Sequence, residues 1–256
     1  MIDARAVVEP GAKLGPGVSV GPYSIIGAQV EIGAGTWIGP HVVITGRTRI
    51  GRDNKIFQFA SLGEEPQDKK YAGEDTALEI GDRNVIREYC TISRGTAQGG
   101  GITQVGNDNW IMAYVHIAHD CKVGHQAIFA NSASLAGHVT VEDYAILGGF
   151  TLVHQFCAIG AHCFCGMGSV ISKDVPPYTM MSGNPVRAHG LNSEGLKRRG
   201  FSAETLRQLR EAYKVIYKSK LTLVQAIARL KEMQYECAEI GVLVAFLERA
   251  TRGIVR

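Results

Sequence analysis

The chain has 256 residues, of which 45% are hydrophobic, so it is long enough to bury a core in one or two domains. Its formal net charge of +3 suits an acidic substrate or partner but falls well short of a nucleic-acid-binding signature. The six cysteines form no CxxC pair, the first residues carry no secretory signal and no apolar run approaches membrane-spanning length, so we expect a cytoplasmic protein with reduced thiols and no integral membrane segment.

From the second residue onward, every sixth residue is aliphatic. The first series comprises Ile2, Val8, Leu14, Val20, Ile26, Ile32, Ile38, Ile44, Ile50, Ile56 and Leu62. If about one residue in three is a large aliphatic, such a run has a probability on the order of one in 10^5. The following residue is often glycine, which tolerates the positive φ or the close approach that tight turns impose. A hexapeptide period of this kind predicts a parallel β-solenoid.

Two segments interrupt the period, Glu64–Leu78 and Arg94–Gln104. The period resumes between them at Ile80 and runs again from Val105 to Ile171. Excursions from a rigid solenoid commonly lie on one face and often carry binding function. The alternative is a pair of solvated loops rich in charge and glycine.

After the sequence DVPPY the pattern becomes helical, and we divide the chain into residues 1–185, a β-helix with excursions at 64–78 and 94–104, and residues 186–256, a helical domain. Ser202 is a predicted N-cap, a second helix is expected from Thr222 and a third over about Glu239–Ala250. These helices would cover the open end of the solenoid, as stacked repeats require.

The hexads are similar to those of the hexapeptide-repeat acyltransferase family. That resemblance implies a left-handed parallel β-helix in which three hexads close one triangular coil, so that residues 18 apart stack on successive coils. Within the stretch VHIAHDC, His119 then lies in one column with Gly137 and Gln155, and Asp120 lies below His138. His154 is beside Gln155, and His116 is one strand corner away from His119.

This column contains the groups that acyl transfer from a thioester needs. A neutral imidazole at His119 can take a hydroxyl proton, with Asp120 as a neighbouring acid. The backbone N–H of Gly137 can hold the oxyanion of a tetrahedral intermediate. The acceptor's own hydroxyl attacks, so the protein needs no nucleophile of its own.

The residues alone leave three alternatives open. Cys121 could be an acyl-enzyme thiol, although neighbouring residues of a strand face opposite sides. His116, His119 and His138 could form a zinc site with an open position, as in hexapeptide-repeat carbonic anhydrases. The polar residues could also be a solvated ladder on a non-catalytic trimeric scaffold, although a scaffold would favour Asn, Thr and Ser over ionisable groups.

Longer strings give a more specific resemblance that extends over the whole chain. They are IGRDNKIFQFASLGEEPQDKKYAGE, HIAHDC, LAGHV, VHQF, DVPPY, GLKRRGF and TRGIVR. Together they resemble the UDP-N-acetylglucosamine O-acyltransferases of lipid A biosynthesis. The resemblance implies a homotrimer that needs no metal or other cofactor and has its sites between neighbouring subunits. Its substrates would be UDP-N-acetylglucosamine, acylated at the sugar 3-hydroxyl (or at the amine of a 3-amino analogue), and an acyl carrier protein that carries an R-3-hydroxyacyl chain.

The same resemblance assigns roles to individual residues. His119 would be the general base, Asp120 would either support it or pair with His138, and Gly137 would supply the oxyanion N–H. The residues implied in substrate binding are Gln67, Asp68, Lys70, His116, His138, His154, Gln155, Asn192, Glu194, Arg198 and Arg199. Among these, Arg198 and Arg199 suit bidentate recognition of the UDP phosphates.

Met167, in the string FCGMGS, departs from the pattern of those family members that have glycine there, at the distal end of the acyl groove. A thioether in that place should shorten the groove, because a pocket discriminates by about 1–3 kcal/mol per misfitting methylene. We therefore expect a preference for acyl chains of about ten to twelve carbons.

Overall fold

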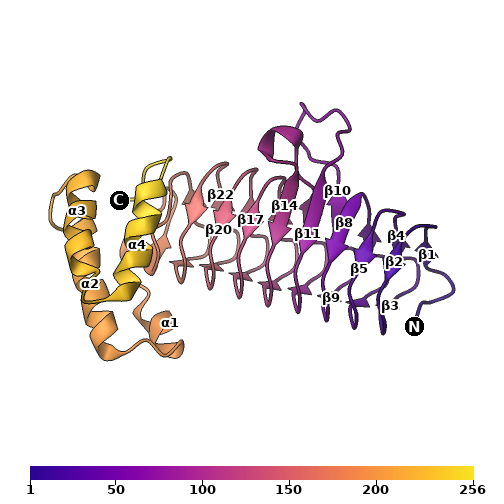
Figure 1. Cartoon of the computed structure of the whole chain (residues 1–256), viewed down its shortest axis with the longest axis horizontal. Helices are drawn as coiled ribbons and strands as arrows, with labels where there is room; N and C mark the ends of the chain where they lie inside the picture. The colour runs from indigo at the N-terminus through magenta and orange to yellow at the C-terminus, as the bar shows by residue number, and fades with distance from the viewer.

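The computed structural model describes residues 1–256, and its short strands wind into one long three-sided prism (Figure 1). Sheet 1 contains β1 (Val7–Val8), β4 (Ile25–Ile26), β7 (Val43–Ile44), β10 (Ser61–Glu64), β13 (Thr91–Ser93), β16 (His116–Ile117), β19 (Ser134–Leu135), β22 (Leu152–Val153) and β25 (Val170–Ile171). Sheet 2 contains β2 (Lys13–Leu14), β5 (Glu31–Ile32), β8 (Arg47–Ile50), β11 (Ala77–Ile80), β14 (Ile102–Val105), β17 (Lys122–Val123), β20 (Thr140–Val141) and β23 (Ala158–Ile159). Sheet 3 contains β3 (Ser19–Val20), β6 (Trp37–Ile38), β9 (Lys55–Ile56), β12 (Val85–Ile86), β15 (Trp110–Ile111), β18 (Ile128–Phe129), β21 (Ile146–Leu147), β24 (Phe164–Cys165), β26 (Thr179–Ser182) and β27 (Arg187–Leu191).

The hexapeptide period determines which side chains enter the core. In β4, for example, Ile25 points outward and Ile26 is fully buried. Ile26 pairs in parallel register with Ile44, and Ile44 pairs with Leu62, so the spacing between stacked residues is 18 as predicted. Full burial of such a side chain stabilises the fold by about 1.5–3 kcal/mol. The predicted fold class, a left-handed parallel β-helix followed by helices, is confirmed.

The corners of the prism show which of its two expected roles the repeated glycine has. The glycine after the aliphatic residue is needed for close approach, because a Cβ on Gly21 would lie 2.7 Å from the carbonyl carbon of Gly39 in the next coil. The positive φ lies two residues later and is usually not on glycine: Tyr23 has φ 61° and His41 has φ 55°. Because these side chains recur on successive coils, their rings stack, with 5.2 Å between the Tyr23 and His41 centroids.

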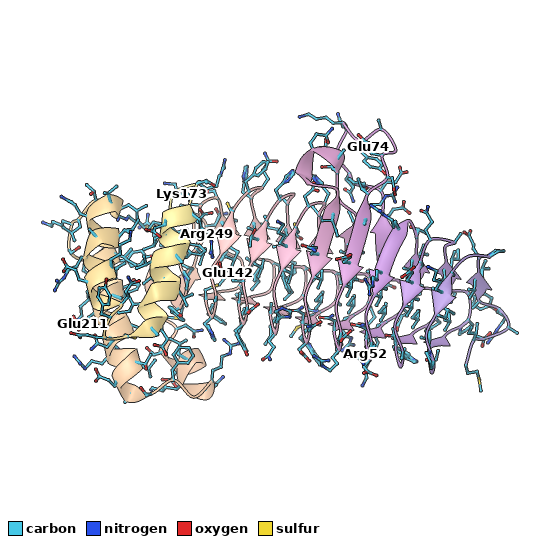
Figure 2. The ribbon with its side chains drawn as sticks, in the orientation of Figure 1. Arg52, Glu74, Glu142, Lys173, Glu211 and Arg249 are labelled. Atoms are coloured by element: carbon cyan, nitrogen blue, oxygen red, sulfur yellow. The ribbon has the colours of Figure 1, made fainter.

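Both excursions leave the prism at the same edge, which we name the sheet 1–2 corner because its turns connect sheet 1 to sheet 2. The first lies between β10 and β11, and the second lies between β13 and β14 and contains the short 3-10 helix η1 (Ala97–Gly99). Figure 1 shows them projecting together beside β10 and β14, and Glu74 labels the first in Figure 2. The C-terminal parts of both predicted excursions are strands, because Ala77–Leu78 of β11 pairs with Ile102–Thr103 of β14.

Four helices follow the last strand. They are α1 (Ser193–Arg198), α2 (Ala203–Tyr217), α3 (Leu223–Met233) and α4 (Ala238–Arg249). Ser202 and Thr222 cap α2 and α3 as predicted, whereas α1 was not expected. None of the helices combines the length and the apolar character needed to cross a membrane.

The helices rest against the last coils of the prism. Arg249 of α4 pairs with Glu142, which follows β20 (Figure 2). The final residues also extend the coil, since the backbone N–H of Val255 donates to the carbonyl of Asp174 at 2.9 Å. β27 still pairs with β26, so sheet structure continues past residue 185 to Leu191. The division into two domains at residue 185 stays a prediction.

Candidate active site at the sheet 1–2 corner

His119 and Asp120 lie in the turn between β16 and β17, at the corner from which both excursions project. His119 Nδ1 and Asp120 Oδ2 are 2.7 Å apart, so the ring can donate a hydrogen bond to the carboxylate. Asp120 adopts φ 60°, which carries its side chain back into the corner. The Asp120 side chain is fully buried and that of His119 is 15% exposed. A carboxylate therefore fixes one ring nitrogen while the other edge of the imidazole stays accessible.

Asp120 receives further hydrogen bonds from the second excursion. The Thr96 backbone N–H donates to Asp120 Oδ1 at 2.9 Å, and the Thr96 hydroxyl donates to Oδ2 at 2.6 Å. The Asp120 backbone N–H in turn donates to Thr103 Oγ1 at 2.8 Å. A buried carboxylate needs such donors in place of water. The sequence offered no signal for Thr96, because an excursion has no place in the 18-residue stack.

Gly137 lies directly above His119, as the column argument predicts. A Cβ on Gly137 would be 2.5 Å from His119 Cε1 and 2.7 Å from Nε2, so only glycine leaves room for the ring. The N–H of Gly137 donates to no acceptor in the protein. The free edge of the imidazole and an unused backbone donor are thus neighbours.

His138 stacks above Asp120, also as predicted. Its backbone N–H donates to the His119 carbonyl at 3.0 Å, and its ring stacks on Phe156 with centroids 4.4 Å apart. His138 Nε2 is 3.7 Å from Asp120 Oδ2, compared with 2.7 Å for His119 Nδ1. The shorter contact favours the arrangement in which Asp120 orients His119. Burial lowers the pKa of His138 below its ordinary value, and the Asp120 carboxylate partly offsets this.

Asp68 belongs to the first excursion, which leaves the prism at this corner. Its carboxylate is the smallest of the influences on the pKa of His138, which it raises against the larger effect of burial. Asp68 Oδ1 accepts the backbone N–H of Lys70 at 3.0 Å. The side chains of Gln67 and Lys70 are exposed. The three residues predicted from the first excursion are therefore at the sheet 1–2 corner, with Asp68 partly covered.

The remaining predicted histidines lie beside the column. His116 points outward from β16, and its Nδ1 is 2.7 Å from the Thr91 hydroxyl. Burial lowers the pKa of His116. His154 and Gln155 occupy the same corner one coil beyond Gly137 and are exposed, with His154 Nδ1 3.3 Å from an Arg252 guanidinium nitrogen.

The residues predicted to hold UDP lie elsewhere on the chain. Asn192 caps α1, and its side chain donates to the His162 carbonyl at 3.0 Å. Glu194 forms an exposed ion pair with Lys197 at 2.7 Å. These contacts place the start of α1 at the corner between sheets 2 and 3, and not at the sheet 1–2 corner.

The two arginines of the KRR run differ from each other. Arg199 covers the ring of Tyr144, 4.8 Å from its centroid, and lies 3.4 Å from His162 Nδ1. Arg198 is exposed and makes no ion pair. Within one protomer, Arg199 is therefore at a different corner from His119, and the two predicted parts of the site do not meet.

The structure also bears on the thiol and zinc alternatives. Cys121 is buried in the prism, its Sγ donates to the Ala136 carbonyl at 3.2 Å, and burial raises its pKa to about 12, which argues against a thiolate nucleophile. His119, Asp120 and His138 have ligand atoms within 4.8 Å of one another and could hold a metal ion. His116 is not part of that group, so the predicted three-histidine set does not converge within one chain.

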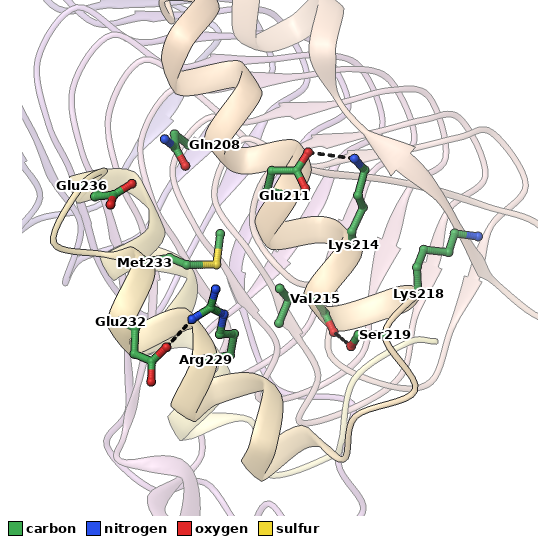
Figure 3. A pocket seen from close by; sticks show the side chains of 10 residues that line it. All are labelled: Gln208, Glu211, Lys214, Val215, Lys218, Ser219, Arg229, Glu232, Met233 and Glu236. Carbon is green, nitrogen blue, oxygen red and sulfur yellow. Dashed lines mark hydrogen bonds and ion pairs between the residues drawn. The ribbon is translucent and has the colours of Figure 1, made fainter.

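A cavity of about 570 Å³ lies between α2 and α3 (Figure 3). Four of its six charged side chains form two ion pairs, since Glu211 contacts Lys214 at 2.7 Å and Arg229 pairs with Glu232. None of the predicted site residues lines this cavity. Met167, at the corner between sheets 3 and 1, is 79% exposed and belongs to neither this cavity nor the His119 column.

Comparison with known proteins assigns the family. Family models match residues 174–255, described as domain 2 of UDP-N-acetylglucosamine O-acyltransferase, and residues 102–137, described as bacterial transferase hexapeptide repeats. Solved structures of LpxA from Acinetobacter baumannii and of UDP-N-acetylglucosamine acyltransferase from Francisella novicida superimpose with TM-scores of 0.97 and 0.98. These structures are 50% and 44% identical in sequence to this chain. Each superposition covers 100% of this chain, and they cover 99% and 94% of the Acinetobacter and Francisella chains, respectively.

Curated relatives agree over the full length. Acyl-[acyl-carrier-protein]–UDP-N-acetylglucosamine O-acyltransferases of Thiobacillus denitrificans and Alkalilimnicola ehrlichii are 61% and 57% identical over 255 residues, covering 100% of this chain and 99% of each relative. The resemblance predicted from the sequence strings is thereby confirmed. The chain belongs to the family of the acyl-[acyl-carrier-protein]–UDP-N-acetylglucosamine O-acyltransferases.

Proposed function

We propose that the chain transfers an R-3-hydroxyacyl group from acyl carrier protein to the 3-hydroxyl of UDP-N-acetylglucosamine, the first step of lipid A biosynthesis. Full-length relatives that are named as O-acyltransferases for these two substrates support the reaction, and they favour a hydroxyl over an amine as the acceptor. A mildly basic chain suits both an acidic carrier protein and a diphosphate. The predicted cytoplasmic location stays a prediction.

His119 acts as the general base in this proposal. The observation that carries it is the 2.7 Å contact between His119 Nδ1 and a fully buried carboxylate, on a ring whose Nε2 edge faces Gly137. With Nδ1–H held by Asp120, Nε2 has the free lone pair that removes the proton of the attacking hydroxyl. The attack on the thioester carbonyl gives a tetrahedral oxyanion, which the unused Gly137 N–H can stabilise. Collapse of this intermediate expels the carrier thiolate, which takes a proton from the imidazolium.

The substrate would be held by residues of two protomers of a homotrimer. His116, His138, His154, Gln155 and the first excursion would surround the base, while Asn192, Glu194, Arg198 and Arg199 of a neighbouring subunit would contact UDP. This arrangement accounts for the separation of Arg199 and His119 on different corners of one chain. Exposed aromatic side chains on sheet 3 and on the corner between sheets 3 and 1 also support association. They are Tyr23, Trp37, Phe59, Tyr89, Trp110, Tyr114 and Phe150.

We place Met167 at the distal end of the acyl groove, where its length favours chains of about ten to twelve carbons. Its exposure in the single chain is what a groove completed by a neighbouring subunit requires.

The experiment that tests the proposed reaction is a turnover assay of the purified protein with UDP-N-acetylglucosamine and a panel of 3-hydroxyacyl carrier proteins. We expect one acyl ester on the sugar 3-hydroxyl, identified by mass spectrometry and NMR, and no activity after removal of either substrate. Absence of product with every donor, from a protein that is folded and associated, would refute the proposal.

A further inference from the structure

The second excursion interrupts the hexapeptide repeat, and one of its residues, Thr96, contacts the Asp120 side chain. Thr96 is 1% exposed and lies at the N-cap of η1, where its hydroxyl also accepts the Gly99 N–H at 3.2 Å. From this position it donates twice to Asp120, through its backbone N–H to Oδ1 and through its hydroxyl to Oδ2. Apart from His119 and His138, no basic side chain contacts the buried Asp120 carboxylate. Thr96 is thus its main support outside the coil.

We propose that Thr96 is a positioning residue that acts on the reaction only through Asp120. This role of Thr96 rests on the proposed function of His119 as the general base. The two donors fix both carboxylate oxygens, so that the Oδ2 lone pair that remains is directed at His119 Nδ1. Thr96 thereby determines which ring nitrogen carries the proton and leaves Nε2 free.

The nearest competing arrangement shows why such support matters. His138 Nε2 is only 3.7 Å from the same oxygen that His119 contacts at 2.7 Å. A carboxylate that is free to rotate could therefore leave His119 and pair with His138. The Thr96 hydroxyl, 2.6 Å from Oδ2, opposes that rotation because its hydrogen bond would break.

Gly99 is fitted to the same carboxylate. A Cβ on Gly99 would overlap Asp120 Cγ and both of its oxygens, although the backbone there has no left-handed φ that would itself demand glycine. The segment Thr96–Gly99 therefore packs around the Asp120 carboxylate: Thr96 donates hydrogen bonds to it, and Gly99 has no side chain that would collide with it. Gly99→Ala provides a second perturbation of Asp120 that leaves the Thr96 hydroxyl in place.

The test is a double-mutant cycle on steady-state acyl transfer, with Thr96→Val in the wild type and in an Asp120→Ala background. In the wild type, we expect Thr96→Val to lower kcat about 10–100-fold, the size expected when a buried carboxylate loses one charge-assisted hydrogen bond, with KM for UDP-N-acetylglucosamine changed less than about twofold. In the Asp120→Ala background the same substitution should change kcat less than about twofold, because residues that act through one another are not additive. Thr96→Ser keeps the hydroxyl and should restore kcat to within about threefold of the wild type.

Thr140→Val, on the outer face of sheet 2, is the matched control and should leave kcat unchanged. The proposal is overturned if Thr96→Val leaves kcat intact in the wild type, or if it lowers kcat as much when Asp120 is already absent. If Thr96→Val alone does not fold, Gly99→Ala decides, since it must lower kcat in the wild type and not in Asp120→Ala. Failure of the base assignment is separate, because only that failure leaves His119→Ala active.

Discussion

Replacing Gly137 by alanine should inactivate the site while the fold is retained. Gly137 does not have a left-handed φ, so the backbone accepts an alanine. The added Cβ would lie 2.5 Å from His119 Cε1, however, where an ordinary contact is near 3.4–4 Å. The imidazole must therefore move by about 1 Å, a misplacement of the kind that lowers turnover strongly.

The size of the effect follows from what the movement breaks. Displacing the ring lengthens the 2.7 Å contact between His119 Nδ1 and Asp120, a charge-assisted hydrogen bond worth about 1.5–3 kcal/mol. If that energy is lost in the transition state, kcat falls by about 10–150-fold, and loss of the base itself would bring the factor to about 10^2–10^4. The free energy of unfolding should change by less than about 1 kcal/mol, because the ring can turn outward into solvent.

The assay compares kcat of Gly137→Ala and wild type with UDP-N-acetylglucosamine and a 3-hydroxyacyl carrier protein, alongside thermal unfolding. Gly27→Ala is the matched control, because a Cβ there would lie no nearer than 3.4 Å to any atom outside its chain neighbours. It should leave kcat unchanged. A Gly137→Ala protein with wild-type kcat would refute the claim that the His119 ring must remain where the structure places it.

Three further predictions concern other groups. Burial between aromatic rings, and to a lesser extent the nearby Arg199, lowers the pKa of His162 from 6.5 to about 4. Because the unfolded chain binds this proton at a higher pH than the folded chain, the free energy of unfolding decreases as the pH falls through this range. With an allowance for the partial exposure of His162, the free energy of unfolding in urea should decrease between pH 7.5 and 4.5 by about 2 kcal/mol more for wild type than for His162→Phe. Equal decreases would contradict the lowered pKa of His162. Met167→Gly should raise kcat/KM for longer acyl donors relative to C10–C12 donors by at least about tenfold; an unchanged donor profile would exclude a role for Met167 in chain length. Cys121→Ala should keep kcat within about threefold, whereas complete loss in a folded protein would revive the acyl-enzyme thiol.

Much of the site could be predicted because the fold is periodic. Once three hexads form one coil, residue numbers translate into stacked positions, which is why His119, Gly137, Asp120 and His138 lie as expected. The same regularity placed the inward aliphatic residues, including Ile26 and its neighbours. For a residue inside the repeat, the residue number alone thus predicts which residues lie above and below it.

Features outside the period could not be found in this way. Thr96 reaches Asp120 from an excursion whose path depends on its own turns, and no spacing rule connects the two. The packing of Arg199 on Tyr144 depends on how α1 docks, which tertiary contacts determine. The sequence also left open whether the repeated glycine serves positive φ or close approach. The structure shows close approach at Gly21, with the positive φ on residues such as Tyr23.

The most direct test of the proposed mechanism is the acyl-transfer rate of His119→Ala, measured against wild type and against His189→Ala, a substitution of an exposed histidine on β27 at a distance from the His119 column. We expect kcat of His119→Ala to fall by about 10^2–10^4-fold while its thermal unfolding and its state of association match the wild type, and we expect His189→Ala to be fully active. Near-normal turnover by a folded His119→Ala protein would contradict the assignment of His119 as the general base.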